Sequence, residues 1–113
     1  MFTYDLQVRQ GEQFNKTISI VDENGKPISL RNCSAMAQIR PKAGSATLTA
    51  EMSASVNASQ GKITLQLQGN RTANIETGTY EYDVCTINGS KVKYYIGGKF
   101  RVLPKVTDAN VGN

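Results

Sequence analysis

Histidine is absent from this chain of 113 residues, and only two cysteines are present. Without histidine the chain lacks the commonest general base, the Ser–His and Cys–His nucleophilic pairs and the usual nitrogen ligand of zinc. Two cysteines alone cannot complete a four-ligand zinc site. The remaining acid–base candidates are Asp22 with Glu23 and Glu81 with Asp83, but such pairs are usually solvated strand faces. We therefore expect no enzyme, no metal and no cofactor.

Long apolar runs are also missing, and none approaches the length needed to cross a membrane. The first residues, MFTYDLQVRQ, alternate as a strand does and lack the basic start and apolar run of a secretory signal. Gly97-Gly98 lacks the helix and the Lys-Ser/Thr ending of a phosphate-binding loop. We expect a protein made in the cytoplasm, without membrane contact, in which Cys33 and Cys85 are small strand residues rather than a crosslink.

The net charge is +4, from 13 basic and 9 acidic residues. A nucleic-acid binder clusters lysine and arginine beside exposed aromatic rings. Here the basic residues are scattered, and only Lys91, Lys93, Lys99 and Arg101 lie close together. We interpret these four as the solvated face of a terminal hairpin and do not expect nucleic acid as a partner.

Short apolar–polar alternations fill most of the chain, and no segment has the 3.6-residue period of a helix. We expect strands over residues 4–8, 13–21, 28–30, 33–39, 47–49, 62–68, 80–85, 91–96 and 99–103. Asn24-Gly25 and Asn88-Gly89 predict tight turns, Gly97-Gly98 a bulge or bend, and residues 53–60 a return of the chain. One helical turn is expected within 69–77.

Seven to nine short strands with frequent turn signals favour an antiparallel β-sandwich, with a barrel as the alternative. We expect one β-sandwich domain over residues 1–105 and a flexible C-terminal tail over 106–113. Ile75, Gly78 and Tyr80 resemble the tyrosine corner of immunoglobulin-like sandwiches, in which the phenol hydroxyl binds backbone upstream. That role is structural. The tryptophan and the paired cysteines of true immunoglobulin domains are missing.

Several segments follow one another in a characteristic order: Arg9-Gln10-Gly11, Asp22-x-Asn24-Gly25-x-Pro27-Ile28-x-Leu30, AMAQIR (35–40), GKITL (61–65), TGTYEYDV (77–84) and GKFRVLPKVT (98–107). In order and spacing they resemble a family of phage virion domains that includes the N-terminal domain of phage baseplate upper proteins and small tail-associated proteins. This chain departs from the family in having Ile20 where relatives commonly show tryptophan, and we expect no fibre after Asn113.

The resemblance implies an immunoglobulin-like β-sandwich that docks onto other phage virion proteins. We expect a structural protein of the virion, in the tail, baseplate, neck or capsid, with a homo-oligomer as a further expectation. The alternative is a carbohydrate-binding host-adhesion module, which requires exposed tyrosine and Asn/Asp gathered in one concave site.

The terminal hairpin supplies the interface candidates. Tyr94 and Tyr95 are expected to place one ring on each face of their strand. We predict Lys93, Tyr95, Lys99 and Arg101 as interface residues, because edge strands with free backbone groups recruit partners by strand addition.

Overall fold

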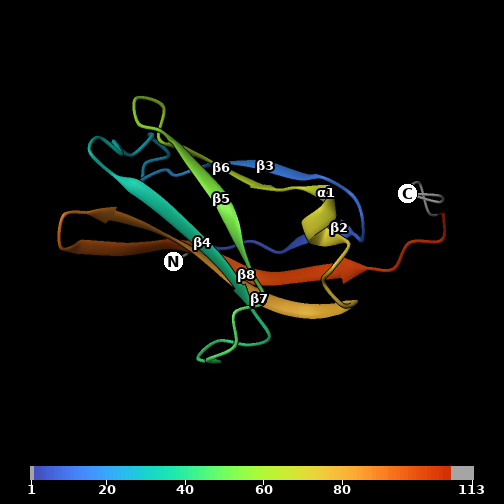
Figure 1. The fold of residues 1–113 in the computed structure, drawn as a ribbon. Helices are drawn as coiled ribbons and strands as arrows, with labels where there is room; N and C mark the ends of the chain where they lie inside the picture. The colour runs from blue at the N-terminus through green and yellow to red at the C-terminus, as the bar shows by residue number, and fades with distance from the viewer. Residues whose placement is uncertain (1, 108–113) are drawn as a thin grey trace.

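The computed structural model describes residues 2–107 and contains eight strands and one short helix in that range. In chain order these are β1 (Phe2–Thr3), β2 (Leu6–Arg9), β3 (Phe14–Ser19), β4 (Ser34–Arg40), β5 (Ala50–Asn57), β6 (Lys62–Leu67), α1 (Gly69–Thr72), β7 (Gly78–Asn88) and β8 (Lys91–Leu103). The protein is all-β, and its strands form a mixed, strongly curled half-barrel sheet (Figure 1).

The sheet follows the strand order β1-β8-β7-β4-β5-β6-β3, and β2 also pairs with β8. The curl is concentrated at β5. Its first residues pair with β4, as Met52 does with Ala37, and its later residues pair with β6, as Val56 does with Ile63. One strand therefore joins the two halves of the sheet, which face each other across the apolar core.

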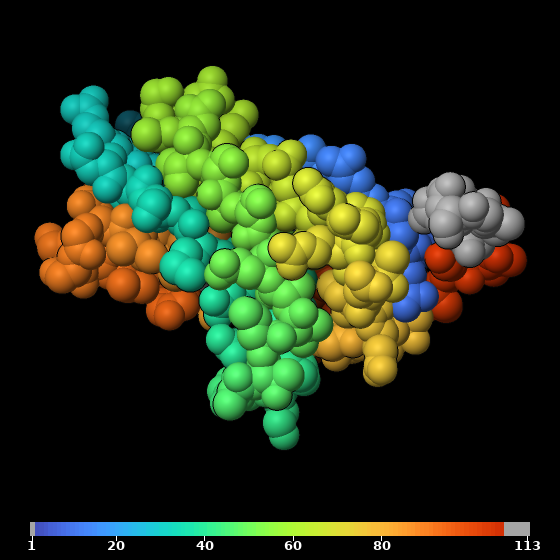
Figure 2. Space-filling model, in the orientation of Figure 1, coloured from blue at the N-terminus to red at the C-terminus, as the bar shows by residue number. Residues whose placement is uncertain are grey.

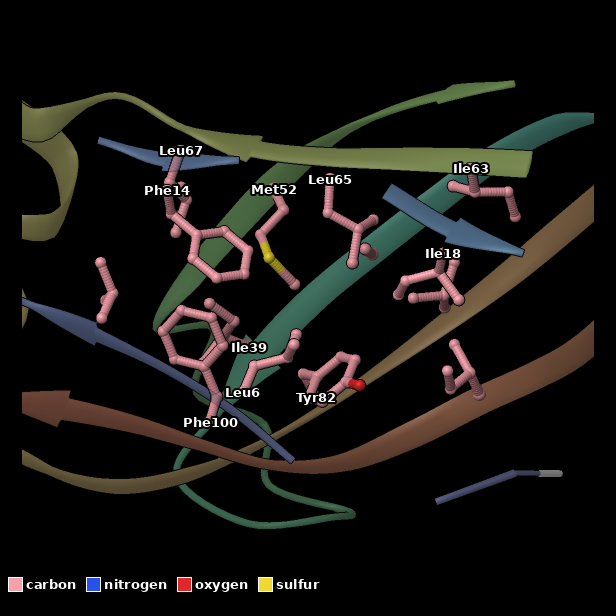
Figure 3. Packing of buried hydrophobic residues seen from close by; sticks show 14 of the residues in the cluster. Leu6, Phe14, Ile18, Ile39, Met52, Ile63, Leu65, Leu67, Tyr82 and Phe100 are labelled. Atoms are coloured by element: carbon pink, nitrogen blue, oxygen red, sulfur yellow. The ribbon is translucent and has the colours of Figure 1, made fainter. Parts of the chain in front are cut away.

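The core is built from the inward positions of the alternating strands. Phe100 of β8 is fully buried, and its ring centroid lies 5.3 Å from that of Phe14 on β3 and 6.4 Å from that of Tyr82 on β7 (Figure 3). Both pairs meet edge to face, the arrangement that the ring quadrupoles favour. Since Phe14 and Phe100 come from opposite halves of the sheet, this contact holds the curled sheet closed.

The expectation of a wholly antiparallel sheet is wrong at the N-terminus. β1 and β2 both pair with β8 in parallel, with Phe2 beside Ile96 and Leu6 beside Phe100. The Tyr4 N–H donates to the Gly97 carbonyl, and the Tyr82 hydroxyl donates to the Tyr4 carbonyl. Turn residues predict how neighbouring segments connect, but they carry no information on a pairing between the two ends of the chain.

The prediction for residues 47–60 is also wrong. Residues 47–49 lie outside the strands, while β5 covers much of the stretch that was expected to turn back. Alanine, serine and asparagine have low strand propensity, but pairing on both sides and the burial of Met52 override it. Residues 28–30 form no strand either, although the Ile28 N–H donates to the Ile20 carbonyl at 2.9 Å.

Several local predictions are confirmed, but the bulge or bend expected at Gly97-Gly98 is not: β8 runs unbroken through both glycines, and its bulge lies at Tyr95. Asn88 pairs with Lys91 around a two-residue turn in which Gly89 has a φ of 62°. The expected helical turn is α1. Cys33 and Cys85 are both free, and Cys85 lies in β7, whereas Cys33 lies just before β4 and not in a strand. Of the predicted tail, residues 108–113 lie outside the described residues. No helix within residues 2–107 is long and apolar enough to cross a membrane.

Candidate functional site

The three residues of the predicted tyrosine corner lie together before and at the start of β7. Ile75 is buried in the core, and the Tyr80 hydroxyl donates to the Glu76 carbonyl oxygen at 2.7 Å. Burial, followed by the negative charge of Glu76, raises the pKa of the Tyr80 phenol. A phenol bonded to the backbone four residues upstream has the geometry of a tyrosine corner and fixes the entry into β7.

Replacing Tyr80 by phenylalanine is expected to lower the free energy of unfolding by about 1 kcal/mol, because the Glu76 carbonyl loses its donor. Urea denaturation at neutral pH measures the loss. The matched control is Tyr94→Phe, which removes a hydroxyl from an exposed ring and is expected to change stability by less than about 0.5 kcal/mol. Equal stability of the wild type and the Tyr80 variant would contradict a structural role for this hydroxyl.

The same variant has a pH signature. The folded state holds the Tyr80 proton more tightly than the unfolded state, whose phenol ionises near its ordinary pKa of 10.0. The stabilisation by the Tyr80 hydroxyl is therefore complete below the pKa of the unfolded state, and it is lost as the pH rises through the higher pKa of the folded state. The stability gap between wild type and Tyr80→Phe should shrink in strongly alkaline solution.

The predicted interface residues do not form one patch. β8 carries one extra residue opposite the Val84/Cys85 step of β7, so that Tyr94 pairs with Cys85 and Ile96 with Val84. This bulge at Tyr95 reverses the alternation expected along β8. Lys93 and Tyr95 therefore lie together, with the Lys93 ammonium 5.3 Å from the Tyr95 ring centroid, and both are separated from Lys99 and Arg101.

Tyr95, which was predicted as an interface residue, is less exposed than its neighbour Tyr94. Tyr95 is half-buried and packs against the core, whereas Tyr94 is 53% exposed. Lys99 forms an ion pair with Glu81, and Arg101 is exposed. A role of these residues in an interface stays a prediction.

The face of β4, β7 and β8 that is turned away from the core is here called the outer face. Across it, Gln38 of β4 pairs with Asp83 of β7, Asp83 with Gly97 of β8, and Gly97 with Thr3 of β1. Residues in register share a face of a sheet, so these four form one polar row. Since Gly97 has no side chain, the row is sunken relative to its neighbours.

This row forms the floor of a hollow of about 690 Å³ on the outer face. Tyr94 forms one wall. Arg40 and the Glu81–Lys99 ion pair form the other, together with the loop around Lys42. Figure 2 shows this loop (green, bottom) projecting beyond the body of the molecule. The hollow therefore has an aromatic wall, a polar floor and a charged wall.

The charged wall is fixed by internal contacts. Hydrogen bonds from the Lys99 ammonium and from the Ala43 N–H, the latter at 2.9 Å, lower the pKa of Glu81. The Arg40 guanidinium donates to the Gln38 side-chain oxygen at 2.9 Å and to the Ser45 carbonyl at 3.1 Å. These groups are already partnered, and their positions are set before any ligand arrives.

Unlike Glu81, the neighbouring carboxylate in the hollow, Asp83 accepts no hydrogen bond from another side chain of the described residues. Burial raises the pKa of its carboxyl, and the positive charge of Arg40 opposes that effect. The Asp83 side chain is exposed in the hollow and receives no side-chain donor from the described residues, so its oxygens can accept hydrogen bonds from a ligand.

The described part of the chain contains no group of three or more Cys, Asp and Glu residues that could hold a metal ion. No protein-family model matches the chain, and no curated protein matches it. The likeness to phage virion domains therefore stays a prediction from the sequence motifs.

The sequence alone does not predict which residues line the hollow. Its alternation places Glu81 and Asp83 on one strand face, but it does not bring them together with Gln38, Tyr94 or Thr3. Gly97 is the one residue that could have pointed to the hollow. It interrupts the row of side chains along a long strand, and such a glycine often marks a bulge or a site where a ligand or another backbone approaches closely.

Proposed function

We propose that this protein is a structural component of a bacteriophage particle, in the tail, baseplate, neck or capsid, which docks onto other virion proteins through an immunoglobulin-like β-sandwich. The observation that carries the proposal is the order of the virion-domain motifs along nearly the whole chain. It includes the segment around Tyr80, whose hydroxyl makes the corner contact with Glu76.

The strand connectivity supports the finer description of the fold. In immunoglobulin-like domains, strands B, E and D are neighbours in one sheet and strands C, F and G in the other. Here β3, β6 and β5 are neighbours in that order, as are β4, β7 and β8. Tyr80 lies near the start of β7, the strand that corresponds to F.

An apolar patch on the outer face supports a docking role. It consists of Met36, Cys85, Ile87, Val92 and Tyr94, which lie in adjacent register positions on β4, β7 and β8. Val92 and Tyr94 are each more than half exposed, at 52% and 53%. Clustered apolar side chains of this kind are typical of protein contacts. The β7–β8 hairpin that carries the patch projects from one end of the molecule (Figure 1, brown).

The proposal is tested on purified particles of the source phage. Mass spectrometry should find the protein at a fixed copy number per particle, and immunolabelling should place it on one substructure. Light scattering of the isolated protein tests whether it forms a homo-oligomer. Absence of the protein from particles would contradict the proposal.

A matched pair of variants tests the docking surface itself. Val92→Asp is expected to leave the fold intact and to prevent incorporation into particles, because a charge is placed in the apolar patch. Leu48→Asp introduces the same charge at a side chain of similar exposure, 46%, outside the patch. It should be incorporated normally. Equal incorporation of the two variants would place the contact elsewhere.

A further inference from the structure

We propose that the hollow on the outer face binds a neutral saccharide. A sugar ring lies against the exposed Tyr94 ring, and its hydroxyl groups donate to the Asp83 carboxylate, with Gln38 and Thr3 completing the polar floor. The hollow and the apolar patch share Tyr94, but Val92, whose substitution tests docking, lies outside the lining of the hollow, so the two proposals are tested separately.

The shape and the composition of the hollow fit this class of ligand. Small-molecule sites combine apolar or aromatic walls with a few placed polar groups, and the volume of about 690 Å³ is within their usual range. A sugar ring is amphipathic: its C–H groups can cover an aromatic face while its hydroxyls bond sideways. Tyr94 and the row of Asp83, Gly97 and Thr3 present those two surfaces next to each other.

Asp83 carries the polar part of the proposal. An ionised carboxylate only accepts hydrogen bonds, so its ligand must be a donor. Two neighbouring sugar hydroxyls can both donate to one carboxylate, and such charge-assisted bonds are stronger than neutral ones. The glycine beside Asp83 leaves room for the ligand to reach the carboxylate.

The charges in the lining argue for a neutral ligand rather than an anion. Arg40, Lys42 and Lys99 are balanced by Asp5, Glu81 and Asp83, three positive charges against three negative. Lys99 is paired with Glu81, and the Arg40 guanidinium donates to Gln38 and Ser45. An anionic group would therefore meet Asp83 without a strong surplus of positive charge to offset it.

We expect the ionised Asp83 carboxylate to lower the stability of the folded state, which agrees with a binding role rather than a structural one. Burial raises its pKa, so the ionised carboxylate destabilises the folded state above that pKa. Asp83→Asn should therefore raise Tm at pH 7. The gain should vanish below the ordinary aspartate value of 3.8, where the carboxyl is protonated in both states.

The test begins with the intact protein on an array of immobilised glucose, galactose, rhamnose and N-acetylhexosamine oligosaccharides, with sialylated oligosaccharides as the anionic comparison. The best free sugar is then titrated into the labelled protein and followed by NMR. We expect a neutral saccharide to bind and to shift the amide signals of β7 and β8 around Asp83 and Gly97.

Four variants complete the test. Asp83→Asn and Tyr94→Ala should each weaken binding at least tenfold, while Tyr94→Phe, which keeps the ring, should bind nearly as the wild type does. Glu23→Gln removes an exposed acid from a distant turn and should change nothing. The proposal is overturned by an array without neutral binders, by selective binding of the anionic sugars, by unchanged affinity of Asp83→Asn, or by a lower Tm of that variant at pH 7, which would make Asp83 a structural residue.

Discussion

Replacing Phe100 by alanine is expected to lower the free energy of unfolding by about 3–5 kcal/mol, the usual cost of removing a buried aromatic ring. Phe100 has no exposed surface, and its ring touches Phe14 from the other half of the sheet as well as Tyr82 from the neighbouring strand. The variant leaves a cavity at the point where the two halves of the curled sheet meet. A single domain of this size has a total stability of roughly 5–15 kcal/mol, so much of it would be lost.

Urea denaturation followed by far-ultraviolet circular dichroism measures the change. Phe2→Ala is the matched control, because the same ring is removed from a side chain that is 59% exposed. We expect the control to change stability by less than about 1 kcal/mol. A loss of similar size in both variants would mean that Phe100 does not occupy the centre of the core.

The parts of the fold that the sequence predicts well are those decided by neighbouring residues. Along β6, Ile63, Leu65 and Leu67 alternate with polar residues, and each of the three is buried. The Asn88-Gly89 turn follows from the positive φ that glycine adopts readily. The corner at Tyr80 belongs to the same group, since donor and acceptor are four residues apart.

The parts that sequence reasoning missed depend on distant partners. β5 has a composition that disfavours strands, and only its pairing with β4 and β6 makes it one. The bulge at Tyr95 is defined by what lies opposite on β7, and it decides which of two adjacent tyrosines is exposed. The hollow depends on the residues that are farthest apart in the sequence, because its floor combines residues of four strands, from Thr3 to Gly97.

Gly61 illustrates how a residue that looks like an ordinary turn glycine can be sterically required. Its φ is +63°, a conformation that costs other residues roughly 1–2 kcal/mol. A Cβ at this position would also lie 2.5 Å from the Ile28 carbonyl oxygen and 3.1 Å from that of Ile20. Both neighbours are backbone atoms, and the Ile28 N–H is bonded to the Ile20 carbonyl, so neither can move without breaking that contact.

Gly61→Ala is therefore expected to destabilise the protein by roughly 2–5 kcal/mol, the sum of the conformational cost and of overpacking against fixed neighbours. Gly89→Ala is the matched control, because Gly89 has a nearly identical φ of +62° and no atom within 4 Å of the position that a Cβ would take. It should lose only the conformational part, roughly 1–2 kcal/mol. Urea denaturation of the two variants isolates the steric contribution as their difference. Equal losses would show that the segment at Ile28 yields to the added methyl group, and the close approach at Gly61 would then contribute nothing to the fold.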